Sequence, residues 1–125
     1  MPVLALAAAL GPGGLALRWP APTTALLVVV LAPLLEEIVF RAGVQDALAA
    51  RSSARLGPLT WANALTAAAF ALFHLARHPV GWAAATCVPA LVFGYFYERH
   101  GRTLAAPIGL HAGYNAVWLV LLGPG

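Results

Sequence analysis

The sequence is short of charge. Only 9% of its 125 residues are charged, four are acidic, and all seven basic residues are arginine. A soluble domain carries about 25% charged residues, so this chain has too few to cover a surface that faces water. Hydrophobic residues, by contrast, make up 62% of the chain. The composition therefore predicts a protein whose natural solvent is lipid.

Cysteine and clustered cations are scarce as well. The single cysteine, Cys87, excludes an internal disulfide and a cysteine-based zinc site. The formal net charge is only +3, and no arginine cluster with interleaved aromatic residues occurs. We therefore expect no nucleic-acid partner. The partner that the composition predicts is membrane lipid.

Apolar segments of helical length account for most of the chain. We predict helices at about residues 24–50, 59–76, 80–97 and 104–122. The predicted fold class is all-α: a polytopic membrane helix bundle with four core transmembrane helices. A short hydrophobic helix at the N-terminus is a candidate fifth.

Two regions follow from this reading. Residues 1–22 form a hydrophobic segment and linker, and residues 23–125 form the core. No lysine or arginine precedes the first apolar stretch, so a cleaved signal peptide is not expected. We expect a threonine of the stretch 20–24 to cap the first helix, and Pro33 and Pro89 to kink the helices that contain them.

Adjacent carboxylates stand out in this apolar setting. Glu36 and Glu37 follow a long uncharged run, and a charge inside a bilayer costs about 2.5–3.5 kcal/mol. An acid in that position is a functional hypothesis by default. Glu37 and Arg41 are four residues apart, so they can form an ion pair within the helix. Glu36 faces about 100° away and is the reactive candidate.

Three further polar residues lie at compatible depth on other predicted helices. They are His74 on the second helix and His111 and Asn115 on the fourth. His111 and Asn115 are four residues apart and point the same way. Phe70 has the same spacing from His74 and would place an aromatic wall beside the imidazole. Taken singly, each polar residue could be an interhelical hydrogen-bonding group worth about 1 kcal/mol. Together with Glu36 they favour one shared site.

Other residues are assigned structural roles. His78 and His100 fall in connections, where we expect them to be solvated. Gly109 and Gly113 have the spacing of a close helix-packing face. The remaining aromatic residues are predicted to be core or interface anchors, and they include Trp61, Trp82, Tyr95, Tyr97, Tyr114 and Trp118.

At this point the residues resemble a known family. Glu36-Glu37-x-x-x-Arg41, Phe70-x-x-x-His74 and His111-x-x-x-Asn115 look like the three motifs of the CPBP family of CAAX proteases and bacteriocin-processing enzymes, also called the ABI family. These are glutamic-type intramembrane endopeptidases. The resemblance extends from about residue 24 to residue 122 and covers the catalytic helices with little flanking sequence. Short members that serve bacterial C-terminal sorting systems, of the JDVT-CTERM type, are similar.

The resemblance implies a role for each motif. Glu36 with His74 would polarise a water molecule for attack on a peptide carbonyl. His111 and Asn115 would donate hydrogen bonds to the developing oxyanion. Glu37 and Arg41 would hold the helix and shape the site. No cofactor is expected. The substrate would be a peptide or protein, with a C-terminal processing or sorting signal as one candidate. The location would be the bacterial cytoplasmic membrane, crossed several times.

Two alternatives remain open on the sequence alone. In the first, Glu36, His74 and His111 bind one divalent metal such as zinc, and the protein is a metal-dependent intramembrane protease. The chain lacks the His-Glu-x-x-His pairing that usually marks zinc proteases. In the second, the protein is a non-enzymatic membrane immunity factor, scaffold or carrier that uses the same buried acids.

Overall fold

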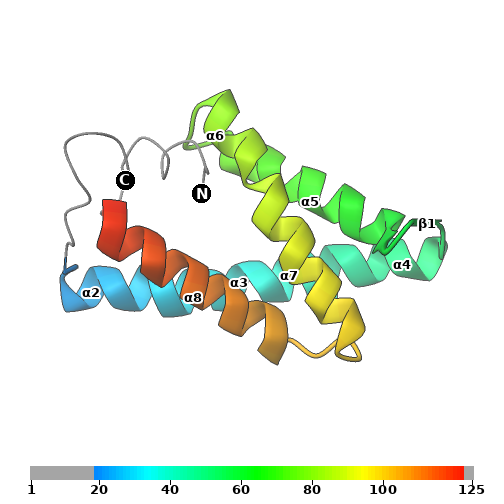
Figure 1. The fold of residues 1–125 in the computed structure, drawn as a ribbon, viewed down its shortest axis with the longest axis horizontal. Coiled ribbons are helices and arrows are strands. Elements are labelled where there is room, and N and C mark those ends of the chain that lie inside the picture. Colours follow the sequence, from blue (N-terminus) through cyan, green and yellow to red (C-terminus); the bar gives the residue numbers. More distant parts are fainter. Residues whose placement is uncertain (1–18, 123–125) are drawn as a thin grey trace.

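Helices dominate the architecture (Figure 1). The computed structural model describes residues 19–122. The first element is one long helix, Pro22–Arg51. Its segments are α2 (Pro22–Ala25), η1 (Leu26–Leu31), α3 (Ala32–Glu37), η2 (Ile38–Gln45) and α4 (Asp46–Arg51). A short antiparallel hairpin follows, made of β1 (Arg55–Leu56) and β2 (Leu59–Thr60). The remaining helices are α5 (Trp61–His74), α6 (Val80–Ala85), α7 (Cys87–Arg99) and α8 (Ala105–Leu122).

The order of packing brings the last helix against the first. Helix α7 packs against both α5 and α8, and α8 in turn runs along η1 and α3 of the long helix. Figure 1 shows α8 beside the half of the long helix that contains α2 and α3. Helix α5 lies above the other half, towards α4. Residues from α3, α5 and α8 can therefore meet in the middle of the bundle.

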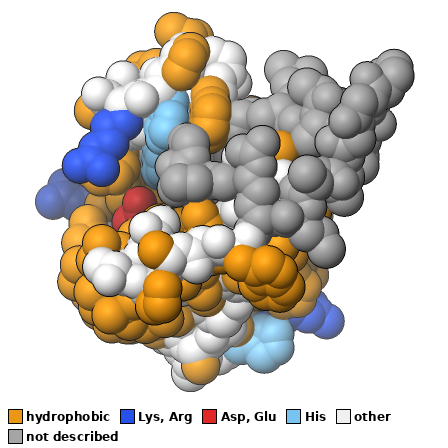
Figure 2. Space-filling model, turned by 90° about the vertical axis from the view of Figure 1, so that its left-hand side faces the viewer, with side chains coloured by type: hydrophobic (Ala, Val, Ile, Leu, Met, Phe, Trp, Pro, Cys, Tyr) orange, Lys and Arg blue, Asp and Glu red, His pale blue; other side chains and the backbone are white. Residues whose placement is uncertain are grey.

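The outer surface is apolar. Leu35, Val39, Val88 and Val117 are each more than half exposed, and hydrophobic side chains cover much of the face drawn in Figure 2. Exposed apolar surface on this scale is stable in lipid and would aggregate in water. The predicted class, an all-α membrane helix bundle, is confirmed.

Three of the four predicted transmembrane helices have the length and composition to cross a bilayer. Among the described residues, three helices are long and apolar enough to cross a bilayer: Pro22–Arg51, Val80–Arg99 and Ala105–Leu122. Helix α5 has 14 residues. At about 1.5 Å per residue it is about 21 Å long, short of a hydrocarbon core of about 30 Å. The candidate N-terminal helix lies outside residues 19–122.

Local chemistry accounts for where these helices begin and break. The N-cap of the long helix is Ala21, with no side-chain hydrogen bond, so the predicted threonine cap was wrong. Pro22 starts the helix because its fixed φ suits the first turn and its missing N–H is not needed there. The predicted helix at 80–97 is divided at Thr86, between α6 and α7. Pro89 lies in the first turn of α7, where a proline is tolerated.

A buried polar strip fastens the long helix to α7. Glu37, Arg41 and Gln45 are each 0% exposed. The Arg41 Nε lies 2.6 Å from Glu37 Oε2, which confirms the predicted ion pair. Arg41 Nη1 donates to Gln45 Oε1 at 2.9 Å, and Nη2 donates to the Ala90 carbonyl at 2.9 Å. The guanidinium therefore binds two side chains of its own helix and one carbonyl of α7.

Gly94 on α7 makes this arrangement possible. A Cβ at this position would collide with the Asn63 side chain and would lie 2.9 Å from Arg41 Nη1. The Gly94 carbonyl accepts a hydrogen bond from Gln45 Nε2 at 3.3 Å. Asn63 Nδ2 donates to the Leu91 carbonyl at 3.0 Å. Only glycine lets the long helix, α5 and α7 approach this closely.

Candidate active site

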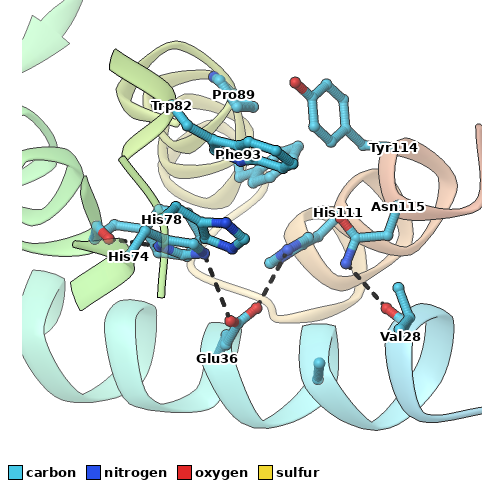
Figure 3. Close-up of a pocket in the computed structure, with 12 residues that line it drawn as sticks. Val28, Glu36, His74, His78, Trp82, Pro89, Phe93, His111, Tyr114 and Asn115 are labelled. Carbon is cyan, nitrogen blue, oxygen red and sulfur yellow. Dashed lines mark hydrogen bonds and ion pairs between the residues drawn. The ribbon is translucent and has the colours of Figure 1, made fainter. Parts of the chain in front are cut away.

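Glu36 lies on the long helix beside Glu37 but points into a different environment. Its side chain is 20% exposed, whereas that of Glu37 is 0% exposed. Glu36 opens onto a cavity of about 130 Å³ between the long helix, α5, α6, α7 and α8 (Figure 3). The lining residues are Val28, Ala32, Glu36, Phe70, His74, His78, Trp82, Pro89, Phe93, His111, Tyr114 and Asn115. The polar residues that were predicted to share one site, Glu36, His74, His111 and Asn115, therefore line the same cavity.

His74, at the C-terminal end of α5, presents one ring nitrogen to Glu36. Its Nδ1 lies 2.7 Å from the Phe70 carbonyl, which can only accept, so Nδ1 carries the proton. In the neutral ring, Nε2 then has a free lone pair. Nε2 lies 3.9 Å from Glu36 Oε1, too far for a direct hydrogen bond. A water molecule between them would contact both groups.

His111, from α8, approaches Glu36 from the other side. Its Nδ1 is 2.8 Å from Glu37 Oε1, and its Nε2 is 3.4 Å from Glu36 Oε2. Since the Glu37 carboxylate accepts, the Nδ1 of His111 donates. Both imidazoles therefore turn Nε2 towards Glu36, as Figure 3 shows. The contact between Glu37 and His111 joins residues 74 positions apart and has no signal in the sequence.

Asn115 is positioned by a π-helical segment, η1, of the long helix. Its Nδ2 donates to the Val28 carbonyl at 2.9 Å. In an α-helix, that carbonyl would accept from the N–H of Ala32, but the Ala32 N–H bonds to Leu27 instead. In this wider register Val28 would pair with residue 33, and Pro33 has no N–H. Pro33, which was predicted to kink the helix, thus leaves a free carbonyl that Asn115 occupies.

Aromatic rings flank the two imidazoles. The Phe70 ring centroid lies 4.4 Å from that of His74, which confirms the aromatic wall predicted from their spacing. Phe93 of α7 stacks on His111, with centroids 4.9 Å apart and planes 19° from parallel. Phe70 also meets the His111 ring edge-on at 5.9 Å. These contacts restrict the orientation of both histidines.

Three lining residues had been assigned other roles from the sequence. His78 was expected to be solvated, but it is half-buried and stacks on Trp82, with centroids 4.4 Å apart. Trp82 and Tyr114 had been read as anchors, and both line the cavity. His74, His78 and Trp82 are spaced four residues apart, which is the spacing of side chains on one face of a helix. This pattern was not used because the helix was predicted to end at about residue 76, before His78. His100 is exposed, as expected.

An apolar groove adjoins the cavity between α7 and α8. Its volume is about 630 Å³, and it shares Pro89, Phe93 and Tyr114 with the cavity. The other lining residues are Val88, Val92, Gly109, Leu110, Gly113, Val117 and Trp118. A Cβ added at Gly109 or Gly113 would meet no described atom within 4 Å. These glycines thus widen a groove, and within the described part of the chain they do not form the helix-packing face predicted from their spacing.

The alternative metal site is not preformed. Among residues 19–122, no group of three His, Cys, Asp or Glu side chains is arranged to hold a metal ion. The donor types of Glu36, His74 and His111 would suit zinc, and metal dependence stays an alternative to be tested by metal removal.

Comparison with known proteins identifies a family. No curated protein and no solved structure matches the chain. A protein-family model does match, over residues 18–117, and its description is "Type II CAAX prenyl endopeptidase Rce1-like". The match includes Glu36, His74, His111 and Asn115 and covers most of the chain. The chain therefore belongs to the Rce1-like type II CAAX prenyl endopeptidase family, as its three motifs had indicated.

Proposed function

We propose that this protein is an intramembrane endopeptidase that hydrolyses a peptide bond with a water molecule held between Glu36 and His74. The observation that carries the proposal is the convergence on Glu36. Two imidazoles from different helices present Nε2 to the same carboxylate, at 3.9 Å and 3.4 Å. Carboxylate and imidazole are the groups that most often move protons in enzymes.

Glu36 and His74 each receive one hydrogen of the water molecule. Glu36 takes one proton from the water as its oxygen attacks the carbonyl carbon, and the Nε2 lone pair of His74 accepts the second hydrogen as a hydrogen bond. The carbon–nitrogen bond then breaks, and protonated Glu36 returns its proton to the leaving amine. The products are a new carboxyl terminus and a new amino terminus, and Glu36 is again ionised.

His111 and Asn115 would stabilise the oxyanion. For His111 to donate from Nε2, both ring nitrogens must carry hydrogens, with the Nδ1 hydrogen directed to the Glu37 carboxylate at 2.8 Å. The Asn115 amide donates one hydrogen to Val28 and carries a second. Each donor to an oxyanion is worth about 2.7–4 kcal/mol.

The substrate we propose is a peptide tail with an apolar part. The groove between α7 and α8 joins the cavity at Pro89, Phe93 and Tyr114 and offers an apolar surface to a prenyl chain or a hydrophobic segment. CAAX tails and C-terminal sorting signals both have this chemistry. The setting we propose is the bacterial cytoplasmic membrane, crossed several times.

The test compares cleavage by the protein and by its Glu36→Gln variant. Both are expressed in the same membranes, and new C-termini are identified by terminal labelling and mass spectrometry. We expect new C-termini that disappear in Glu36→Gln, while Glu98→Gln, which changes an acid outside the cavity, retains them. Cleavage that persists in Glu36→Gln would remove Glu36 from the mechanism. Binding or transport without any cleavage would favour the non-enzymatic alternative.

A further inference from the structure

Arginines gather at one end of the bundle. Among residues 19–122 there are six arginines, and four of them lie where the long helix and α7 end: Arg51, Arg55, Arg99 and Arg102. Figure 1 shows the hairpin beside α4 at this end. In membrane proteins the side richer in arginine faces the cytoplasm. The lipids of that leaflet carry negative headgroups, so this end of the bundle meets an anionic surface.

A pocket between the hairpin and the last turn of α7 presents two of these arginines. Its volume is about 220 Å³, and it is lined by Arg55, Pro58, Tyr95, Glu98 and Arg99. The Glu98 carboxylate accepts from Thr60 Oγ1 at 2.7 Å, and among residues 19–122 no ion pair joins it to either arginine. Arg55 Nη2 donates to the Pro58 carbonyl at 3.2 Å, whereas no hydrogen bond engages the Arg99 side chain in the described part of the chain. Both cations are thus available to an anion.

An apolar surface continues from this cationic pocket along α7. A second pocket, of about 300 Å³, shares Tyr95 with the first, and its other lining residues are Leu59, Val88, Leu91, Val92 and Phe96. Along α7, positions 88, 92, 95 and 99 follow one another at steps of three or four residues, so their side chains form one stripe on the helix surface. The stripe is apolar from Val88 to Tyr95 and ends in the cation of Arg99.

The length of this stripe matches one leaflet of a bilayer. Val88 and Arg99 are 11 residues apart, which corresponds to about 17 Å at about 1.5 Å per residue. Half of a hydrocarbon core of about 30 Å is about 15 Å. The stripe therefore extends from the level of the headgroups to near the middle of the bilayer, with positive charge at its outer end alone. A lipid with an anionic headgroup has the matching length and distribution of charge.

We propose that Arg55 and Arg99 bind the phosphate of an anionic phospholipid whose acyl chain lies along α7. The planar guanidinium group of arginine binds phosphate oxygens with paired hydrogen bonds. Tyr95 lies where the headgroup meets the chain, the level at which tyrosine is enriched in membrane proteins. Val88 and Val92 also line the apolar groove between α7 and α8, so the bound chain borders that groove. This lipid site is separate from the cavity at Glu36 and does not depend on the proposed peptidase function.

Native mass spectrometry of the full chain in detergent tests the headgroup. Dioleoyl phosphatidylglycerol and dioleoyl phosphatidylcholine, which have the same acyl chains, are added in equal amounts, and we expect preferential retention of phosphatidylglycerol. Arg55→Gln and Arg99→Gln should each lower the ratio of the two bound lipids about fivefold, the effect of one arginine near an anionic surface. Arg51→Gln, which removes an exposed arginine from the same end but outside the pocket, should keep the ratio. Equal retention of the two lipids, or an equal loss in Arg51→Gln, would overturn the proposal.

A second pair of variants tests the acyl chain. Val92→Asn places a polar group in the stripe, and Val39→Asn makes the same change at an exposed position of the long helix. We expect Val92→Asn alone to lower the retention of phosphatidylglycerol, because the acyl chain loses apolar contact. A large excess of inorganic phosphate should not displace the lipid, since phosphate lacks the chain. Displacement by phosphate, or equal retention in the two valine variants, would show that the pocket binds a free anion and would overturn the lipid site.

Discussion

His111 and Arg41 share a single carboxylate. One oxygen of Glu37 lies 2.8 Å from His111 Nδ1, and the other lies 2.6 Å from Arg41 Nε. The sequence indicated the second contact and gave no sign of the first. Glu37 thus links the polar strip that holds the bundle together to the imidazole that faces Glu36.

This dual contact predicts that Glu37→Gln impairs both stability and activity. The substitution leaves the Arg41 charge buried without a counter-ion, which typically costs about 3–5 kcal/mol. We expect a lower Tm and little cleavage, measured on the same preparation in detergent. Glu36→Gln should lose cleavage with little change in Tm.

A double variant separates the two roles of Glu37. Glu37→Gln combined with Arg41→Met removes the unpaired charge and should recover much of the lost stability. Cleavage should stay low because His111 still lacks its carboxylate. Full recovery of cleavage in the double variant would show that the contact with His111 is unimportant.

The contact between Asn115 and Val28 predicts a link between a proline and catalysis. Asn115→Ala should lower kcat by about 10²–10³ with little change in KM, as expected for one oxyanion donor. Pro33→Ala supplies an N–H that competes for the Val28 carbonyl. We expect it to preserve or raise Tm and still to lower kcat. Unchanged kcat in Pro33→Ala would mean that Asn115 holds its position without Val28.

The packing at Gly94 predicts a contrast between two glycines. Gly94→Ala forces Asn63 and Arg41 apart and should destabilise the protein by about 1–3 kcal/mol, the usual range for overpacking. Gly109→Ala meets no described atom within 4 Å and should change stability by no more than about 0.5 kcal/mol. Both values can be measured by denaturant unfolding in the same detergent. Equal effects would contradict the packing described around Gly94.

Metal removal distinguishes the glutamic mechanism from its metal-dependent alternative. We expect cleavage to persist at its full rate after exhaustive treatment with EDTA and 1,10-phenanthroline. Loss of activity that returns on addition of zinc would assign Glu36, His74 and His111 as ligands. Inductively coupled plasma mass spectrometry of the purified protein provides the control for residual metal.

Features close together in the sequence were predictable. Helical periodicity placed Glu37 against Arg41 and Phe70 against His74, and both pairs occur in the structure. The family motifs also identified some of the residues that line the cavity, namely Glu36, Phe70, His74, His111 and Asn115. Spacing of four residues carries this information because such side chains lie on one face of a helix.

Features that depend on tertiary packing were not predictable. The hydrogen bond from Asn115 to the Val28 carbonyl joins residues 87 positions apart, and no local sequence pattern indicates it. The prediction that His78 is solvated was wrong. The turn after α5 places the His78 ring between those of His74 and Trp82, and it stacks with both.

The ion pair within the long helix also bears on how the protein enters its membrane. Because Glu37 and Arg41 belong to one segment, their charges cancel before any other helix arrives. An uncompensated arginine near the middle of a span would oppose its transfer from the translocon by about 2.5–3.5 kcal/mol. We therefore expect the segment 22–51 to integrate on its own, and glycosylation mapping should show poorer integration for Glu37→Ala than for the native segment.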